Sequence, residues 1–270
     1  YADHRDPAAR SDYHHWLRRR GIEPQNGDRF SRSETARLPE DCSKPKFLAD
    51  EACRFIEAYR DRPFVLYVNF LEPHMPFFGP RDDQYDPADV PLPDNFECRT
   101  SAQNSLKARM LETAYYRDGH SGMQLRTDDD WRRMIAHYWG LCSQVDTHAG
   151  RILDQLEACG LTDETIVVFT SDHGDMMGAH GLLAKCVMFE EAVRVPLLLR
   201  LPGQNRQVRV GDPVSQVDLV PTLLDLLDEE IPPALQGKSL RPALESGRPT
   251  HGEPVVIEWN GPNNGGLSRY

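Results

Sequence analysis

The sequence has no apolar run that approaches the roughly 18 residues needed for a membrane-spanning helix. Its best apolar runs, such as residues 195–199, have the length of buried strands, so no membrane span is predicted. An excess of positive charge is also missing, since the formal net charge is −11 and the pI is about 5.4. This balance argues against a module that wraps nucleic acid, and no nucleic-acid partner is expected.

Cysteine pairs are missing as well. The six cysteines form no Cys-x-x-Cys motif and no spacing typical of a disulfide framework, so we interpret them mostly as buried thiols. The first residues, Tyr1-Ala2-Asp3-His4, contain neither an initiator Met nor the hydrophobic core of a signal peptide. We therefore expect a piece of a longer protein, and we leave its cellular location and oligomeric state open.

The first hundred residues contain one predicted helix and one predicted central strand. Residues 1–45 are polar, which indicates a surface loop or insertion with a single short helix at 13–20. Apolar residues recur at helical spacing over 47–59. The continuous apolar run at 64–70 is typical of a strand covered on both faces. Residues 72–98 are rich in Pro and Asp, which predicts a loop.

The remaining elements alternate between helices and strands. Apolar residues at steps of three and four predict a long helix over 130–159. Runs rich in β-branched and apolar residues predict strands at 165–170 and 195–201. A further helix begins near Asp218, and 255–259 is a candidate last strand. Such an order predicts an α/β fold whose central sheet is mainly parallel, with helices on both faces.

Reactive side chains are concentrated in two loops that directly follow predicted strands. Glu72-Pro73-His74 follows the strand at 64–70, and Ser171-Asp172-His173-Gly174-Asp175 follows the strand at 165–170. Ligands of parallel sheets bind at the carboxyl ends of strands. The adjacent carboxylate and imidazole of Asp172 and His173 can both coordinate a divalent cation. Lys185 follows a loop containing glycine, and its flexible ammonium can reach anionic oxygens. We therefore expect all four side chains to share one cleft.

The order of these motifs resembles the sulfatase family of the alkaline-phosphatase superfamily. The motifs are Pro-His74-x-Pro-Phe, a long helix, Ser-Asp172-His173-Gly-Asp, and Gly-x-His-Gly-x-x-x-Lys185. The resemblance covers roughly residues 46–245, which we assign to part of an α/β catalytic domain. Residues 1–45 would then be a polar insertion, and 246–270 the start of a C-terminal subdomain.

The resemblance implies a role for each candidate residue. Asp172 and His173 would be two ligands of a divalent metal ion, most often Ca²⁺, with Mg²⁺ or Mn²⁺ as alternatives. His74 and Lys185 would be catalytic residues that hold the sulfate or leaving-group oxygens. The nucleophile of the family is a formylglycine made within a Cys/Ser-x-Pro-x-Arg motif. This sequence lacks that motif, because Cys42-Ser43-Lys44-Pro45 has the wrong spacing, and we expect the nucleophile upstream.

The activity expected from the resemblance is hydrolysis of a sulfate monoester of a small molecule or glycan. One alternative is a phosphonate monoester hydrolase or phosphodiesterase of the same superfamily. Another is a binding protein that kept the fold without the nucleophile. A Cys-x-Pro-x-Arg motif upstream would separate an enzyme from this last alternative.

Overall fold

The computed structural model describes residues 9–247 and 254–258. The chain divides after Pro202 into a larger unit and a smaller one over residues 203–264, and each is treated by itself. Within the described ranges, no helix has both the length and the apolar composition required to cross a bilayer.

The longest element of the larger unit is helix α5, Asp128–Ala158, which confirms the helix predicted at 130–159. Thr127 and Asp130 form a capping box at its start, which satisfies backbone N–H groups that have no partner inside the helix. The buried face differs in part from the predicted stripe, since it includes Gln144 and His148 besides apolar residues. A polar stripe inside the unit cannot be recognised from apolar periodicity alone.

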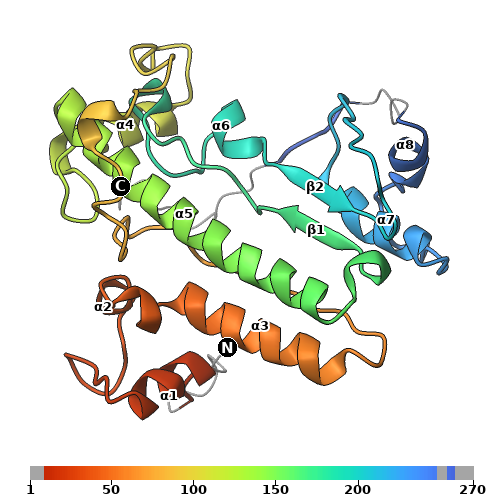
Figure 1. Ribbon diagram of the computed structural model, residues 1–270. Coiled ribbons are helices and arrows are strands. Elements are labelled where there is room, and N and C mark those ends of the chain that lie inside the picture. The colour runs from red at the N-terminus through yellow and green to blue at the C-terminus, as the bar shows by residue number, and fades with distance from the viewer. Residues whose placement is uncertain (1–8, 248–253, 259–270) are drawn as a thin grey trace. The chain divides into compact units, whose positions relative to one another are not determined.

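Helix α3, Lys44–Tyr59, lies alongside α5 in Figure 1 and confirms the helix predicted at 47–59. The Ser43 side chain caps its start by accepting the N–H of Lys46. Asp50 fixes the two helices to each other, because its carboxylate accepts from Lys46 Nζ and from Arg151 on α5, both at 2.6 Å.

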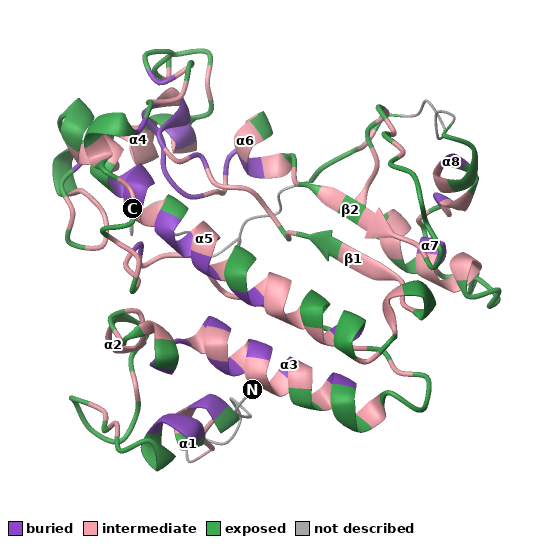
Figure 2. Ribbon diagram, viewed as in Figure 1, coloured by how far each residue is buried: buried purple, intermediate pink, exposed green. Residues whose placement is uncertain are grey.

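Residues 9–42 are packed more closely than their polar composition suggests. Helix α1, Asp12–Arg19, confirms the short predicted helix, and α2, Arg32–Thr35, follows. Tyr13, Trp16 and Leu17 are buried, and the two aromatic rings contact Phe47 on α3. Figure 2 shows buried turns on α1 as well as on α3 and α5. The aromatic side chains of α1 therefore anchor this segment to the larger unit.

The sheet differs from the predicted one. Among the described residues it has two strands, β1, Val167–Thr170, and β2, Leu197–Arg200, and these pair antiparallel. The predicted mainly parallel arrangement is therefore not confirmed. In the sequence, the short helix α6, Glu190–Val193, comes between the two strands. Parallel neighbouring strands are usually joined by a longer crossover helix. Apolar runs identify strands, but they carry no information on direction.

Residues 64–70, predicted as a strand, have no assigned secondary structure, and the sheet formed by the described residues contains only β1 and β2. Val65 and Tyr67 are 90% and 86% exposed, so the predicted burial on both faces is wrong for the chain as it stands. Residues 72–98 are mostly loop, as predicted. Helix α4, Leu106–Asp118, was not predicted, and Ala108 is the residue that it buries fully.

The smaller unit contains helices α7, Leu219–Leu226, and α8, Arg241–Ser246. Asp218 precedes α7 as predicted, but its carboxylate accepts the N–H groups of Ser215 and Lys238 instead of capping the helix. Residues 254–258 form no strand, and Trp259 of the predicted last strand lies outside the described residues. Short 3₁₀ helices in the two units cover Glu40–Cys42, Pro87–Asp89, Thr162–Glu164, Ala179–Gly181 and Gln216–Asp218.

Candidate functional site

The loop after β1 places Asp172 and His173 through a tight local turn. Ser171 Oγ donates to the His173 carbonyl at 2.8 Å, and the His173 N–H donates to Asp172 Oδ1 at 3.0 Å. The next residue, Gly174, donates its N–H to the Ala192 carbonyl at 2.9 Å. A Cβ at Gly174 would lie 1.9 Å from the Glu191 carbonyl oxygen. Glycine is therefore required because two backbone segments approach closely.

Asp175 braces this loop through hydrogen bonds to two backbone N–H groups. Its Oδ1 accepts the N–H groups of Met177 at 3.1 Å and Ala184 at 2.9 Å. Burial raises the pKa of the Asp175 carboxyl, while the two hydrogen bonds oppose that rise. Because Ala184 precedes Lys185, Asp175 links the Asp172–His173 turn to the segment that carries the lysine.

His74 and Lys185 are in direct contact, although 111 residues separate them in the sequence. Lys185 Nζ lies 2.6 Å from His74 Nε2. An ammonium can only donate, so Nε2 is the acceptor, and the proton of the neutral ring lies on Nδ1. That nitrogen is 3.0 Å from the Met75 carbonyl oxygen, to which Arg32 also donates at 3.2 Å.

Charge and burial both favour the neutral form of His74. Burial lowers the pKa of His74 below its ordinary value, and the positive charges of Lys185 and Arg32 lower it further, against the Met75 hydrogen bond. A protonated ring would bring a third positive charge between two cations. The site therefore holds two cationic side chains around a neutral imidazole.

The predicted residues come together as a chain of contacts. The rings of His74 and His173 are 6.5 Å apart between centroids, and His173 Nε2 is 3.6 Å from Asp172 Oδ2. His173 Nδ1 is held 2.8 Å from the Gly174 carbonyl oxygen. The ring of His173 is partly exposed, and the side chain of Asp172 is 84% exposed. The roles assigned to the four residues stay predictions.

Sequence reasoning missed three side chains around this cluster. Arg32 lies 3.1 Å from His74 Nδ1 and comes from the segment interpreted as a polar insertion. The pKa of His120 is lowered by burial, and further by the positive charge of Lys185. Glu72 has a buried Oε2 without a hydrogen-bond partner in the described part of the chain. Only Glu72, beside the His74 motif, carried a signal in the sequence.

Asp172 and His173 supply two donor atoms of types that suit a divalent cation. Within residues 9–247 and 254–258, no group of three or more His, Cys, Asp or Glu side chains is placed to hold a metal ion. The described residues therefore provide part of a coordination shell, and the rest would have to come from other groups.

Comparisons with known proteins agree on one family. The family model described as Sulfatase matches residues 7–229. The multifunctional alkaline phosphatase superfamily protein PehA of Trinickia caryophylli is 31% identical, over 88% of this chain and 51% of its own. The choline-sulfatase of Rhizobium meliloti is 32% identical, over 73% of this chain and 38% of its own. The chain thus spans about half the length of the curated relatives it matches, or less.

The solved structures add a comparison of the fold. The phosphonate monoester hydrolase of Agrobacterium radiobacter superposes with a TM-score of 0.75 at 30% identity, covering 97% of this chain and 56% of that one. Most of the chain therefore has the fold seen in about half of that enzyme.

Proposed function

Because the chain belongs to the sulfatase family, we propose that the native protein hydrolyses sulfate monoesters, with His74 and Lys185 at the ester group. The observation that supports this proposal most directly is the 2.6 Å contact between Lys185 Nζ and His74 Nε2. This contact brings together two sequence motifs that are far apart in the chain and places a cationic side chain beside a histidine.

Lys185 is the residue that stabilises charge in this proposal. Among the described residues its ammonium donates to His74, and an ammonium has two further N–H bonds for ester oxygens. Negative charge grows on the leaving and equatorial oxygens as the S–O bond breaks. A preorganised cation therefore stabilises the transition state more than the bound ester. Neutral His74 orients the ammonium and keeps the positive charge on the lysine.

Two further parts of the proposal are a metal ion and a nucleophile, neither of which the described residues supply by themselves. Asp172 and His173 would be two ligands of a divalent cation, with Ca²⁺ as the first choice and Mg²⁺ or Mn²⁺ as alternatives. Such an ion would neutralise sulfate oxygens and acidify the nucleophile. The nucleophile itself is proposed to be a formylglycine contributed by sequence other than this chain.

A phosphonate monoester hydrolase is the second candidate, and a specific observation favours it. The Agrobacterium radiobacter enzyme covers nearly all of this chain at 30% identity. A phosphonate monoester, like a sulfate monoester, is a tetrahedral group with a single negative charge. The same ammonium and imidazole therefore suit both esters, and the assay has to compare them directly.

The test measures turnover of an aryl sulfate and an aryl phosphonate monoester by the native protein and its Lys185→Ala variant. Losing one preorganised contact typically costs roughly 3–4 kcal/mol, so kcat is expected to fall on the order of a hundred- to a thousand-fold. KM should change less. Lys185→Arg should rescue poorly, because a planar guanidinium presents its donors differently.

Lys46→Ala is the matched control, since Lys46 pairs with Asp50 on α3 and does not contact His74 or Lys185. Near-wild-type turnover of both esters by Lys185→Ala would contradict the assignment of Lys185. No turnover of either ester by the folded native protein would favour a non-catalytic binding protein.

A further inference from the structure

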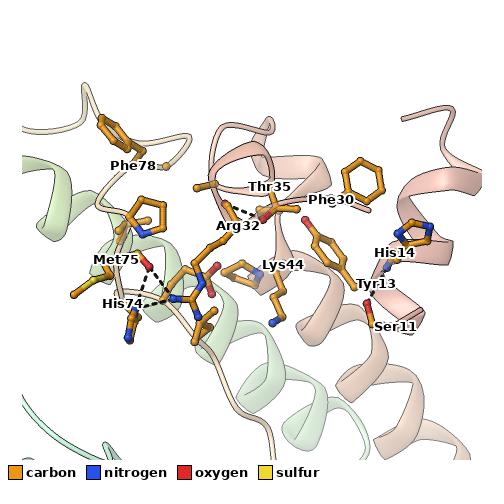
Figure 3. Close-up of a pocket in the computed structure, with 18 of the residues that line it drawn as sticks. Ser11, Tyr13, His14, Phe30, Arg32, Thr35, Lys44, His74, Met75 and Phe78 are labelled. Atoms are coloured by element: carbon orange, nitrogen blue, oxygen red, sulfur yellow. Dashed lines mark hydrogen bonds between the residues drawn. The ribbon is translucent and has the colours of Figure 1, made fainter. Parts of the chain in front are cut away.

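The position of the Lys185 ammonium depends on two things, its contact with His74 and the backbone that carries the lysine. Figure 3 shows His74 fixed on its other side, near the Met75 carbonyl and Arg32. The backbone before Lys185 forms a tight turn over residues 178–182, in which N–H groups donate to carbonyls of the same turn. What holds this turn in place therefore also determines where the ammonium lies.

The backbone around the turn has an unusual conformation. Between residues 177 and 185, three residues other than glycine have positive φ angles, Met177 at 35°, His180 at 56° and Ala184 at 62°. Steric contacts of the Cβ disfavour these angles, and such a backbone persists where contacts with the surrounding chain fix it. Ala184 is fixed by Asp175, whose Oδ1 accepts its N–H at 2.9 Å. His180 requires a corresponding contact.

His180 is fixed by the loop at 93–98. Its backbone N–H donates to the Asn95 carbonyl at 3.2 Å, and its Nδ1 lies 2.7 Å from the Cys98 carbonyl oxygen. Because a carbonyl can only accept, Nδ1 carries the proton, and Nε2 of the neutral ring is an acceptor. Asn95 Nδ2 lies 3.3 Å from this Nε2 and donates to it. Asn95 therefore holds both the backbone and the ring of His180.

The side-chain amide of Asn95 also reaches the other half of the candidate site. Its Nδ2 donates to Glu191 Oε1 at 2.6 Å. A carboxylate can only accept, so this contact fixes the amide with its nitrogen toward the two acceptors. The Glu191 backbone packs against Gly174, where a Cβ would lie 1.9 Å from the Glu191 carbonyl oxygen. Since Gly174 directly follows His173, one amide group links the segment before Lys185 to the segment behind His173.

From these contacts we infer that Asn95 is a positioning residue for Lys185. Its amide has two N–H bonds, and these match two acceptors that come from the two halves of the site. Without the amide, the turn around His180 is less restrained, and the ammonium spends less time at the ester. The inference rests on the proposed function, in which Lys185 stabilises the transition state. Loss of Asn95 should therefore affect kcat more than KM.

Hydrogen exchange measures the positioning without any ester. In the full-length protein, Asn95→Ala should raise the exchange rates of the backbone amides at 178–185 about tenfold, because hydrogen bonds that restrain local opening are lost. Asn104→Ala is the matched control, since Asn104 lies in the same loop before α4 but its Oδ1 accepts from the Ser101 N–H. Unchanged exchange at 178–185 in Asn95→Ala would overturn the inference.

Turnover of an aryl sulfate tests the link to Lys185. Asn95→Ala should lower kcat about tenfold with little change in KM. It should change the residual turnover of Lys185→Ala by less than about twofold, because residues that act through one group are not additive. Equal losses in both backgrounds would contradict the inference, since a general loss of folding affects both. Raised exchange at 178–185 in a native protein that hydrolyses no ester would count only against the proposed function.

A pair of substitutions tests the contact at nearly constant size. Asn95→Asp places a carboxylate opposite that of Glu191 and should raise exchange at 178–185 at least as much as Asn95→Ala. Adding Glu191→Gln restores a donor and an acceptor across the same contact, so the double variant should recover part of the lost protection. No recovery in a double variant that circular dichroism shows to be folded would refute the link through Asn95.

Discussion

Replacing Glu72 by glutamine keeps the size of the side chain but removes a negative charge that the fold accommodates poorly. Burial raises the pKa of the Glu72 carboxyl, and the nearby charges of Lys44 and Arg32 reduce that rise without cancelling it. Within the described residues, Glu72 Oε2 accepts no hydrogen bond. Desolvation therefore outweighs the favourable charge contacts, and the ionised side chain destabilises the folded chain.

The sign of the pH dependence follows from the raised pKa. Below about pH 4.5, the ordinary value for Glu, the carboxyl is neutral in both folded and unfolded chains and costs nothing. As the pH rises through the raised pKa of the folded state, the unfolded chain loses its proton first, and stability falls. Glu72→Gln should therefore be close to neutral at pH 4 and stabilising at pH 8.

The size of the gain is set by the cost of a buried unsatisfied group, about 1–3 kcal/mol. Because Lys44 and Arg32 offset part of that cost, we expect about 1–2 kcal/mol at pH 8. For a unit of about 200 residues, each kcal/mol corresponds to roughly 2–4 °C in the melting temperature. Urea unfolding of wild type and variant at the two pH values gives the difference directly, and other titrating groups cancel between them. A gain that is the same at both pH values, or a loss at pH 8, would refute the reasoning.

Two further substitutions test the loop after β1. Gly174→Ala should destabilise the larger unit by about 1–3 kcal/mol, because its Cβ would lie 1.9 Å from the Glu191 carbonyl oxygen. Thermal unfolding measures this loss of stability. An unchanged melting temperature would contradict the close approach. Asp172→Ala should weaken Ca²⁺ binding by the native protein at least about tenfold in calorimetry, since a carboxylate is a preferred Ca²⁺ ligand, and unchanged affinity would exclude Asp172 as a ligand.

The sequence predicted the helices better than the sheet. Helices α3 and α5 have apolar periodicity, which is a local signal, although both begin before the predicted ranges, at Lys44 and Asp128. The direction of β1 and β2 depends on how the chain returns between them, which no local pattern encodes. Helix α4 was missed because it buries fully only Ala108 and therefore lacks a distinct apolar face.

Prediction of the site was limited in the same way. The motifs around His74 and Lys185 could be found because each follows or forms a recognisable loop, and their contact then follows from the fold. Arg32 could not be found, because its contact with His74 spans 42 residues and one arginine of a polar segment resembles the others. The burial of Gln144 was not predicted, because the apolar residues of helix α5 indicated a different buried face.

The two ring nitrogens of His74 make different contacts. Its Nε2 accepts from Lys185, and its Nδ1 side faces the Met75 carbonyl and Arg32. A neutral ring can do both, because one nitrogen accepts while the other donates. Protonation would turn Nε2 into a donor, break the contact with Lys185, and place a third positive charge between two cations. Because the pKa of His74 is lowered, the contact between Lys185 and His74 should persist to a lower pH than an ordinary histidine would allow.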